Sequence, residues 1–70
     1  MKRPDHREAV EADFKGRRFE GSFTTSSGMV HVISLSGRKS AQLTGAPPEV
    51  QARTLLLEII IEADAAGKLR

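Results

Sequence analysis

Residues 47–67 have the sequence PPEVQARTLLLEIIIEADAAG and decide the fold, because no other stretch of the chain predicts one structure so clearly. The stretch predicts a single long helix. Pro47 and Pro48 suit the first turn of a helix, where a backbone N–H has no partner to lose. Gly67 suits the left-handed residue that ends a helix, and Lys68 follows it at the negative end of the helix dipole.

The predicted helix is more apolar than one sheet face requires. At about 100° per residue, Gln51, Glu58 and Glu62 fall together and mark a solvent face, with Leu55 at its edge. Apolar side chains fill an arc of roughly 200° around the rest of the helix, whereas an ordinary surface helix needs a stripe of about 100°. A single sheet face is therefore not expected to cover the whole arc.

This excess of apolar surface predicts a homodimer, since pairing across a two-fold axis is the commonest way for a soluble chain to bury such a face. Val50, Leu57 and Ile61 form one flank of the arc. One flank is expected to pack on the sheet, and the other on a second copy. The residues predicted for the dimer or partner interface lie furthest from the solvent face: Ala52, Leu56, Ile59, Ile60 and Ala63.

The size and composition of the chain also favour oligomerisation. A chain of 70 residues forms one small domain, which buries only about 60% of its unfolded surface and is marginally stable alone. Such domains often add disulfides, metals or oligomerisation. The chain has no Cys, and His6 and His31 lie far apart without ligand neighbours, so no disulfide, metal or cofactor is predicted.

The charge and hydropathy of the chain exclude several classes of protein. The net charge of +2 is mildly basic, and well short of a nucleic-acid-binding tail. No run of about 18 apolar residues is present, so no membrane contact is predicted. The absence of Cys fits a cytoplasmic location.

The first part of the chain, residues 1–16, predicts either an N-terminal arm or a short helix, and the sequence leaves both open. In the helix, Asp5 would be the N-cap, Glu8 would take the capping-box position, and Gly16 would follow the last turn. A helix of about ten residues is marginal in isolation.

Residues 17–43 predict three strands. Arg17–Thr25 and Arg38–Leu43 alternate between two kinds of side chain, as half-buried strands do. Met29–Leu35 is apolar on both faces, as in a central strand. Short Ser- and Gly-rich segments between the strands indicate an antiparallel meander. The predicted fold class is therefore α+β, with a three-stranded antiparallel β-meander packed on one long C-terminal helix over residues 47–67.

The alternation also predicts which side chains share a sheet face. Phe19, Phe23, Ala41 and Leu43 are expected to face the helix. The opposite face is expected to have an apolar centre from the middle strand. It would offer these polar side chains to solvent: Arg18, Ser22, Thr24, Arg38, Ser40 and Gln42.

No enzymatic activity is predicted. A general acid and base must converge in one cleft, and the carboxylates of this chain are expected at solvent-facing positions or in the N-terminal arm. His31 is the one candidate base, with Ser34, Ser36 and Ser40 nearby. It is more simply explained as a histidine at the core edge or in an interface.

Four basic residues are the candidates for nucleic-acid binding: Arg17, Arg18, Arg38 and Lys39. They belong to predicted strands that lead through Leu43–Gly45 (LTG) to the helix start at Pro47–Arg53 (PPEVQAR). Over roughly residues 17–66, this order resembles the arm-binding domains of phage integrases and the plant ethylene-response-factor domain. Those families read the DNA major groove with Arg and Trp side chains of the sheet, so the resemblance implies DNA binding. This chain has no Trp, and its outer face carries Glu20.

The strand order and the helix sequence ARTLLLEIIIEA (residues 52–63) also resemble the partner-binding domain of HicB-type antitoxins. That resemblance implies a small regulatory protein that binds another protein. We therefore predict a small, non-catalytic, bacterial or phage-borne binding or regulatory module that acts as a homodimer through protein–protein contacts. A DNA-binding domain that uses the outer sheet face is the alternative.

Overall fold

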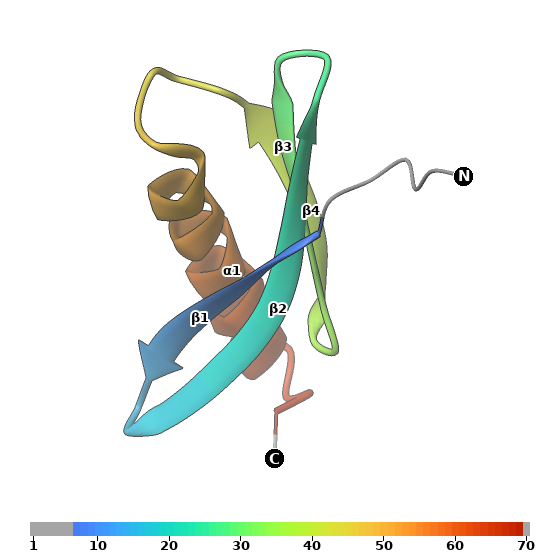
Figure 1. The fold of residues 1–70 in the computed structure, drawn as a ribbon. Coiled ribbons are helices and arrows are strands. Elements are labelled where there is room, and N and C mark those ends of the chain that lie inside the picture. Colours follow the sequence, from blue (N-terminus) through green and yellow to red (C-terminus); the bar gives the residue numbers. More distant parts are fainter. Residues whose placement is uncertain (1–6, 70) are drawn as a thin grey trace, which may run out of the picture.

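The computed structural model describes residues 7–69 and shows a sheet with one helix on one face (Figure 1). The strands β1 (Glu8–Phe14), β2 (Arg17–Ser26), β3 (Met29–Ser34) and β4 (Gly37–Gln42) form an antiparallel sheet in the order β1-β2-β3-β4. The helix α1 (Pro48–Ala65) follows at the C-terminal side. The α+β class and the C-terminal helix are confirmed, whereas the predicted number of three strands is wrong, because the sheet has four.

The additional strand is β1, in the segment predicted as an arm or a short helix. Its side chains alternate: Val10 and Ala12 are buried, and Glu11 between them is exposed. In the sheet these residues pair with β2, with Ala12 opposite Phe19. A lone helix of about ten residues would be marginal, whereas the strand buries two apolar side chains and gives its backbone partners on β2. Asp5, the predicted N-cap, lies outside the described residues.

Two hairpin turns explain why the chain folds back so tightly. Lys15 and Gly16 connect β1 to β2 with φ angles of 52° and 78°. Ser27 and Gly28 connect β2 to β3 with φ angles of 53° and 76°. Two successive residues with positive φ are typical of the type I′ turn, whose twist matches that of the strands. The glycine in second place makes each turn accessible at little steric cost.

The core lies between the sheet and α1. Val30 and Val32 of β3 and Leu56 and Ile60 of α1 are fully buried there. Gly21 of β2 is required by a close approach: a Cβ at this position would stand 2.8 Å from the carbonyl oxygen of Ile33 and 3.4 Å from Leu56.

Both ends of α1 agree with the local signals in the sequence. Pro48 is the first helical residue, which confirms the prediction that proline lies in the first turn of the helix. At the other end, Gly67 has a φ of 75° and donates its N–H to the Asp64 carbonyl at 3.0 Å. The N–H of Lys68 donates to the Ala63 carbonyl at 2.8 Å, which completes a Schellman motif. The predicted left-handed stop is therefore confirmed.

The burial of the strands agrees with the predicted faces. Phe23 is buried on the helix side of the sheet, and Phe19 and Ala41 are half-buried against the same core. Leu43 follows β4 and remains 37% exposed. The opposite face, which we call the open face, has no helix over it among the described residues (Figure 1).

Candidate functional site

The side of α1 that contacts the sheet carries all five residues predicted for the dimer interface. Each of them is at most 5% exposed in the single chain: Ala52, Leu56, Ile59, Ile60 and Ala63. This corrects the predicted interface, because a second copy cannot reach residues that already form the core. Leu55, predicted at the edge of the solvent face, is also buried. The physical reason is β1, which widens the sheet and gives α1 an additional strand to pack on.

The opposite side of α1 carries a second apolar strip, which we call the outer stripe: Val50, Leu57 and Ile61. Val50 and Ile61 are 43% and 46% exposed, and Leu57 is half-buried. At about 100° per residue, the three side chains fall within one sector of the helix, where Val50 and Ile61 face away from the core and Leu57 also packs against the edge of the core. The exposed part of the outer stripe is the apolar surface of the helix that the sheet leaves uncovered.

Ion pairs border the outer stripe on both sides. On the side toward β1, Lys15 Nζ lies 2.9 Å from Asp64 Oδ2. On the side toward β4, Lys39 Nζ lies 3.5 Å from Glu58 Oε1 and also donates a hydrogen bond to Glu62. The hydrogen bond to Glu62 raises the pKa of Lys39 above its usual 10.5. These contacts join the borders of α1 to the two outer parts of the sheet.

The four basic residues predicted for nucleic-acid binding do not converge on one surface. Lys39 turns toward α1, and Arg17 places its guanidinium 4.8 Å from the ring centroid of Phe19 on the helix side. Arg18 and Arg38 belong to the open face. Arg17 and Arg18 lie on opposite faces of the sheet, as do Arg38 and Lys39, because adjacent residues of a strand point to opposite faces. The register therefore leaves Arg18 and Arg38 on the open face, where the alternation predicts them, and sets Arg17 and Lys39 apart from them.

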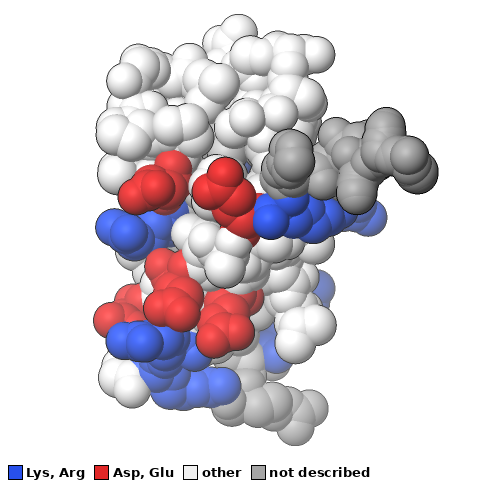
Figure 2. Space-filling model, in the orientation of Figure 1, with Lys and Arg blue, Asp and Glu red and all other residues white. Residues whose placement is uncertain are grey.

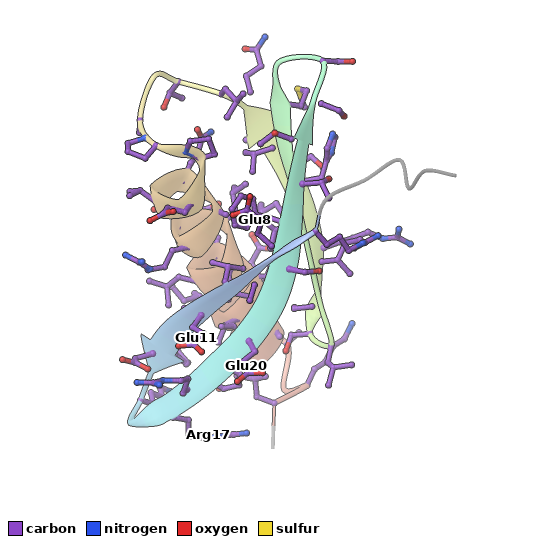
Figure 3. All side chains as sticks on the ribbon, viewed as in Figure 1. Glu8, Glu11, Arg17 and Glu20 are labelled. Atoms are coloured by element: carbon purple, nitrogen blue, oxygen red, sulfur yellow. The ribbon has the colours of Figure 1, made fainter. Side chains whose placement is uncertain are left out.

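Acidic residues neutralise one half of the open face. Arg18 Nη1 lies 3.5 Å from Glu11 Oε1, and its Nε lies 3.5 Å from Asp13 Oδ1. Glu20 stands opposite Glu11 in the β1–β2 register, at the end of the sheet where Figure 3 also places Arg17. Figure 2 shows red and blue side chains interleaved in the lower half of that view. This end of the sheet is electrostatically mixed.

The other half of the open face carries no carboxylate among the described residues. One row across the sheet contains Ala9, Ser22, Ile33 and Arg38, and the adjacent row contains Thr24, His31 and Ser40. Arg7 donates a hydrogen bond to Ser22 Oγ at 3.4 Å. The region therefore combines cations, hydroxyls and the 38%-exposed side chain of Ile33.

His31 lies within this half of the open face. Its Nδ1 is 2.8 Å from Ser40 Oγ, and its Nε2 is 3.4 Å from Ser26 Oγ. A hydroxyl can donate to one nitrogen and accept from the other, so the two serines satisfy either tautomer. No carboxylate of residues 7–69 is hydrogen-bonded to the ring, so the third member of a nucleophile–base–orienter arrangement is not in place there.

The grooves of the described surface are open, and their lining residues form no recognisable reactive site. A groove of about 410 Å³ runs between β1 and the first turns of α1, where Glu8 and Glu49 stand near Arg53. Within residues 7–69, no group of three or more His, Asp or Glu side chains is arranged to hold a metal ion. In the same part of the chain, no helix is both long enough and apolar enough to cross a membrane.

No family model, no curated protein and no solved structure matches this chain. The resemblances to integrase arm-binding domains and to HicB-type antitoxins therefore stay predictions. The outer stripe and the carboxylate-free half of the open face are the two surfaces on which function can be argued.

Proposed function

We propose that this protein is a small, non-catalytic binding module of the cytoplasm that acts as a homodimer. The observation that carries the proposal is the outer stripe, in which Val50 and Ile61 remain more than 40% exposed on a helix whose other side is already covered by the sheet. Exposed apolar patches on small soluble proteins usually mark interaction surfaces. Each subunit of the dimer would keep its open face accessible, and that face would receive the partner protein.

The size of the chain supports self-association. A core formed by one four-stranded sheet and one helix buries only a modest apolar area, so a domain of this size gains little stability alone. Pairing of two copies adds buried surface without any new sequence, and a folded dimer is stabilised further as its concentration rises. No Cys is available to add a disulfide.

Sedimentation equilibrium tests the proposal directly. At about 200 µM chain, a concentration at which a weak micromolar dimer is largely formed, we expect a mass of twice 7.6 kDa. A mass of 7.6 kDa at that concentration, together with a fully formed helix by circular dichroism, would show that the homodimer is wrong.

A second candidate function is nucleic-acid binding by the open face. One observation favours it: the half of that face around Arg38 and His31 combines cations and hydroxyls, and it carries no carboxylate among residues 7–69. Phosphate contacts by such cations dominate nucleic-acid affinity and make it fall steeply with salt.

Matched variants separate the two candidates. If the open face binds duplex DNA, Arg38→Ala should weaken binding and reduce the salt slope by about 0.9 per lost phosphate contact. Arg53→Ala, on α1, removes the same charge elsewhere and should leave binding unchanged. If the open face binds a protein, Ile33→Asp should abolish capture of that partner, whereas Arg38→Ala should matter less. The absence of duplex binding at about 50 mM salt would exclude the nucleic-acid candidate, since affinity is highest at low salt.

A further inference from the structure

The two borders of the outer stripe differ in charge. One border carries Arg53 near the start of α1 and Asp64 near its end, about three helical turns apart. The other border carries Glu58 and Glu62, which are both held by Lys39. The first border therefore has one positive end and one negative end, while on the second border two carboxylates share one ammonium group.

We infer that α1 pairs with α1 of a second copy in an antiparallel arrangement, across a two-fold axis that passes close to Glu58 and Ile59. The inference rests on the proposed homodimer and adds its geometry. A two-fold axis perpendicular to two antiparallel helices brings each border against the same border of the other copy, with its direction reversed. Arg53 then faces the partner subunit's Asp64, and Asp64 faces the partner subunit's Arg53.

The parallel orientation matches the charges less well. In a parallel pair the two-fold axis runs along the helices and sets the border of Arg53 and Asp64 against the other border of the partner subunit, so Asp64 would approach the partner subunit's Glu62. Like charges at such positions destabilise a helix pair, whereas opposite charges favour one orientation and suppress the other. The antiparallel pair also sets the two helix dipoles head to tail.

The side chains at this border are available for the contact. Arg53 is exposed and makes no hydrogen bond or ion pair with any other residue of 7–69. Asp64 already accepts from Lys15 Nζ at 2.9 Å, but a carboxylate has two oxygens and can accept from a second cation. The chain therefore presents an unused guanidinium on one side of the two-fold axis and a carboxylate with spare capacity on the other.

The apolar residues of the outer stripe fit the same axis. Leu57 and Ile61 lie on either side of it, so Leu57 packs beside the partner subunit's Ile61. Val50 lies toward the end of the contact, beside the last turn of the partner subunit's helix. Two helices of this length bury less than the roughly 1,600 Å² of a standard interface, so the expected dimer is weak and its dissociation is measurable at micromolar concentrations.

On the second border, Glu58 comes close to the partner subunit's Glu58. Each of these carboxylates lies 3.5 Å from Lys39 of its own subunit, so the pair of carboxylates meets a pair of ammonium groups. The two ammonium groups reduce the repulsion between the acidic borders. Lys39 therefore acts as a positioning residue for the dimer.

Cysteine cross-linking tests the orientation, because the chain has no Cys of its own. At a rise of about 1.5 Å per residue, the two Leu57 positions of an antiparallel pair lie about 5 Å apart along the helix axis, and the two Val50 positions about 25 Å apart. We therefore expect Leu57→Cys to form a disulfide-linked dimer under mild oxidation. Val50→Cys, the control at a more exposed apolar position of the same stripe, should not exceed the level caused by random collisions.

A charge swap tests the ion pairs independently. Arg53→Asp and Asp64→Arg should each weaken the dimer by roughly 3- to 10-fold, and the double variant should regain the parent affinity. Thermal unfolding of each variant at low concentration separates this effect from the loss of the Lys15–Asp64 contact within the subunit.

The possible outcomes are distinct. If the parent protein sediments as a monomer at about 200 µM, the proposed homodimer itself fails. If the parent is a dimer but Val50→Cys cross-links as well as Leu57→Cys, the helices are parallel and only the inferred geometry fails. If the parent is a dimer and neither cysteine cross-links above the collisional level, α1 does not form the interface. Cross-linking of Leu57→Cys alone, with rescue by the charge swap, supports the antiparallel pair.

Discussion

The two sides of α1 have nearly the same composition and different environments. The inner side places Leu56 and Ile60 in the core with no exposure, whereas the outer side leaves Ile61 46% exposed. Ile60 and Ile61 are adjacent and chemically identical, so their difference comes entirely from where the helix meets the sheet. An apolar residue on a helix thus indicates that some surface will cover it, but not whether that surface belongs to the same chain.

The largest expected effect comes from truncating the inner side. Ile60→Ala should lower the free energy of unfolding by about 2–5 kcal/mol, because it leaves a cavity in a closely packed core. Ile61→Ala is the matched control and should change it by about 0.5 kcal/mol. Urea denaturation at a concentration too low for dimerisation measures both. Equal losses for the two variants would contradict the difference between the two sides.

The sheet contributes its own sensitive position to the inner side. Gly21→Ala should cost about 1–3 kcal/mol, because the new Cβ would stand 2.8 Å from the Ile33 carbonyl oxygen, which is backbone and cannot turn aside. Ser22→Ala, one residue along on the open face, should cost about 0.5 kcal/mol. If the Gly21→Ala variant had the same urea midpoint as the parent, β2 and β3 could move apart to accept the new Cβ without a loss of stability.

The outer side should respond in assembly rather than in folding. Ile61→Glu would place a charge in the proposed helix pair, so the dissociation constant should rise at least about tenfold while the helix signal in circular dichroism is retained. Ile33→Glu adds the same charge at an exposed isoleucine of the open face and should leave the dimer mass unchanged. Dissociation by both variants would locate the interface elsewhere.

The smallest effect concerns the border of α1 that faces β4. Pairing with Glu62 raises the pKa of Lys39 above 10.5, so the contribution of this pairing to stability is complete below that pH and is lost as the pH rises through the higher pKa of the folded state. The thermal midpoint of the parent should therefore fall faster than that of Lys39→Met between about pH 10 and pH 12. Parallel curves for the two proteins would show that the contact does not contribute.

Several features of the fold follow from the sequence because their causes are local. The prolines at 47 and 48 and the glycine at 67 set the ends of α1 through backbone angles and missing N–H groups, which need no tertiary partner. The alternation in Arg17–Thr25 and Arg38–Leu43 predicts β2 and β4 and their faces, since period two is a property of the extended backbone itself, and the apolar run Met29–Leu35 predicts β3 between them.

Other features were decided only by tertiary structure. The segment Glu8–Phe14 has both helix-forming residues and an alternating pattern. It forms a strand because it pairs along the edge of β2 over seven residues. The Lys15–Gly16 dipeptide between two alternating runs was the one local signal for this hairpin. The number of strands then decided which part of the apolar arc of α1 is core and which part remains at the surface. Helical periodicity cannot separate core from surface within the arc, because that division depends on the width of the sheet that the rest of the chain builds.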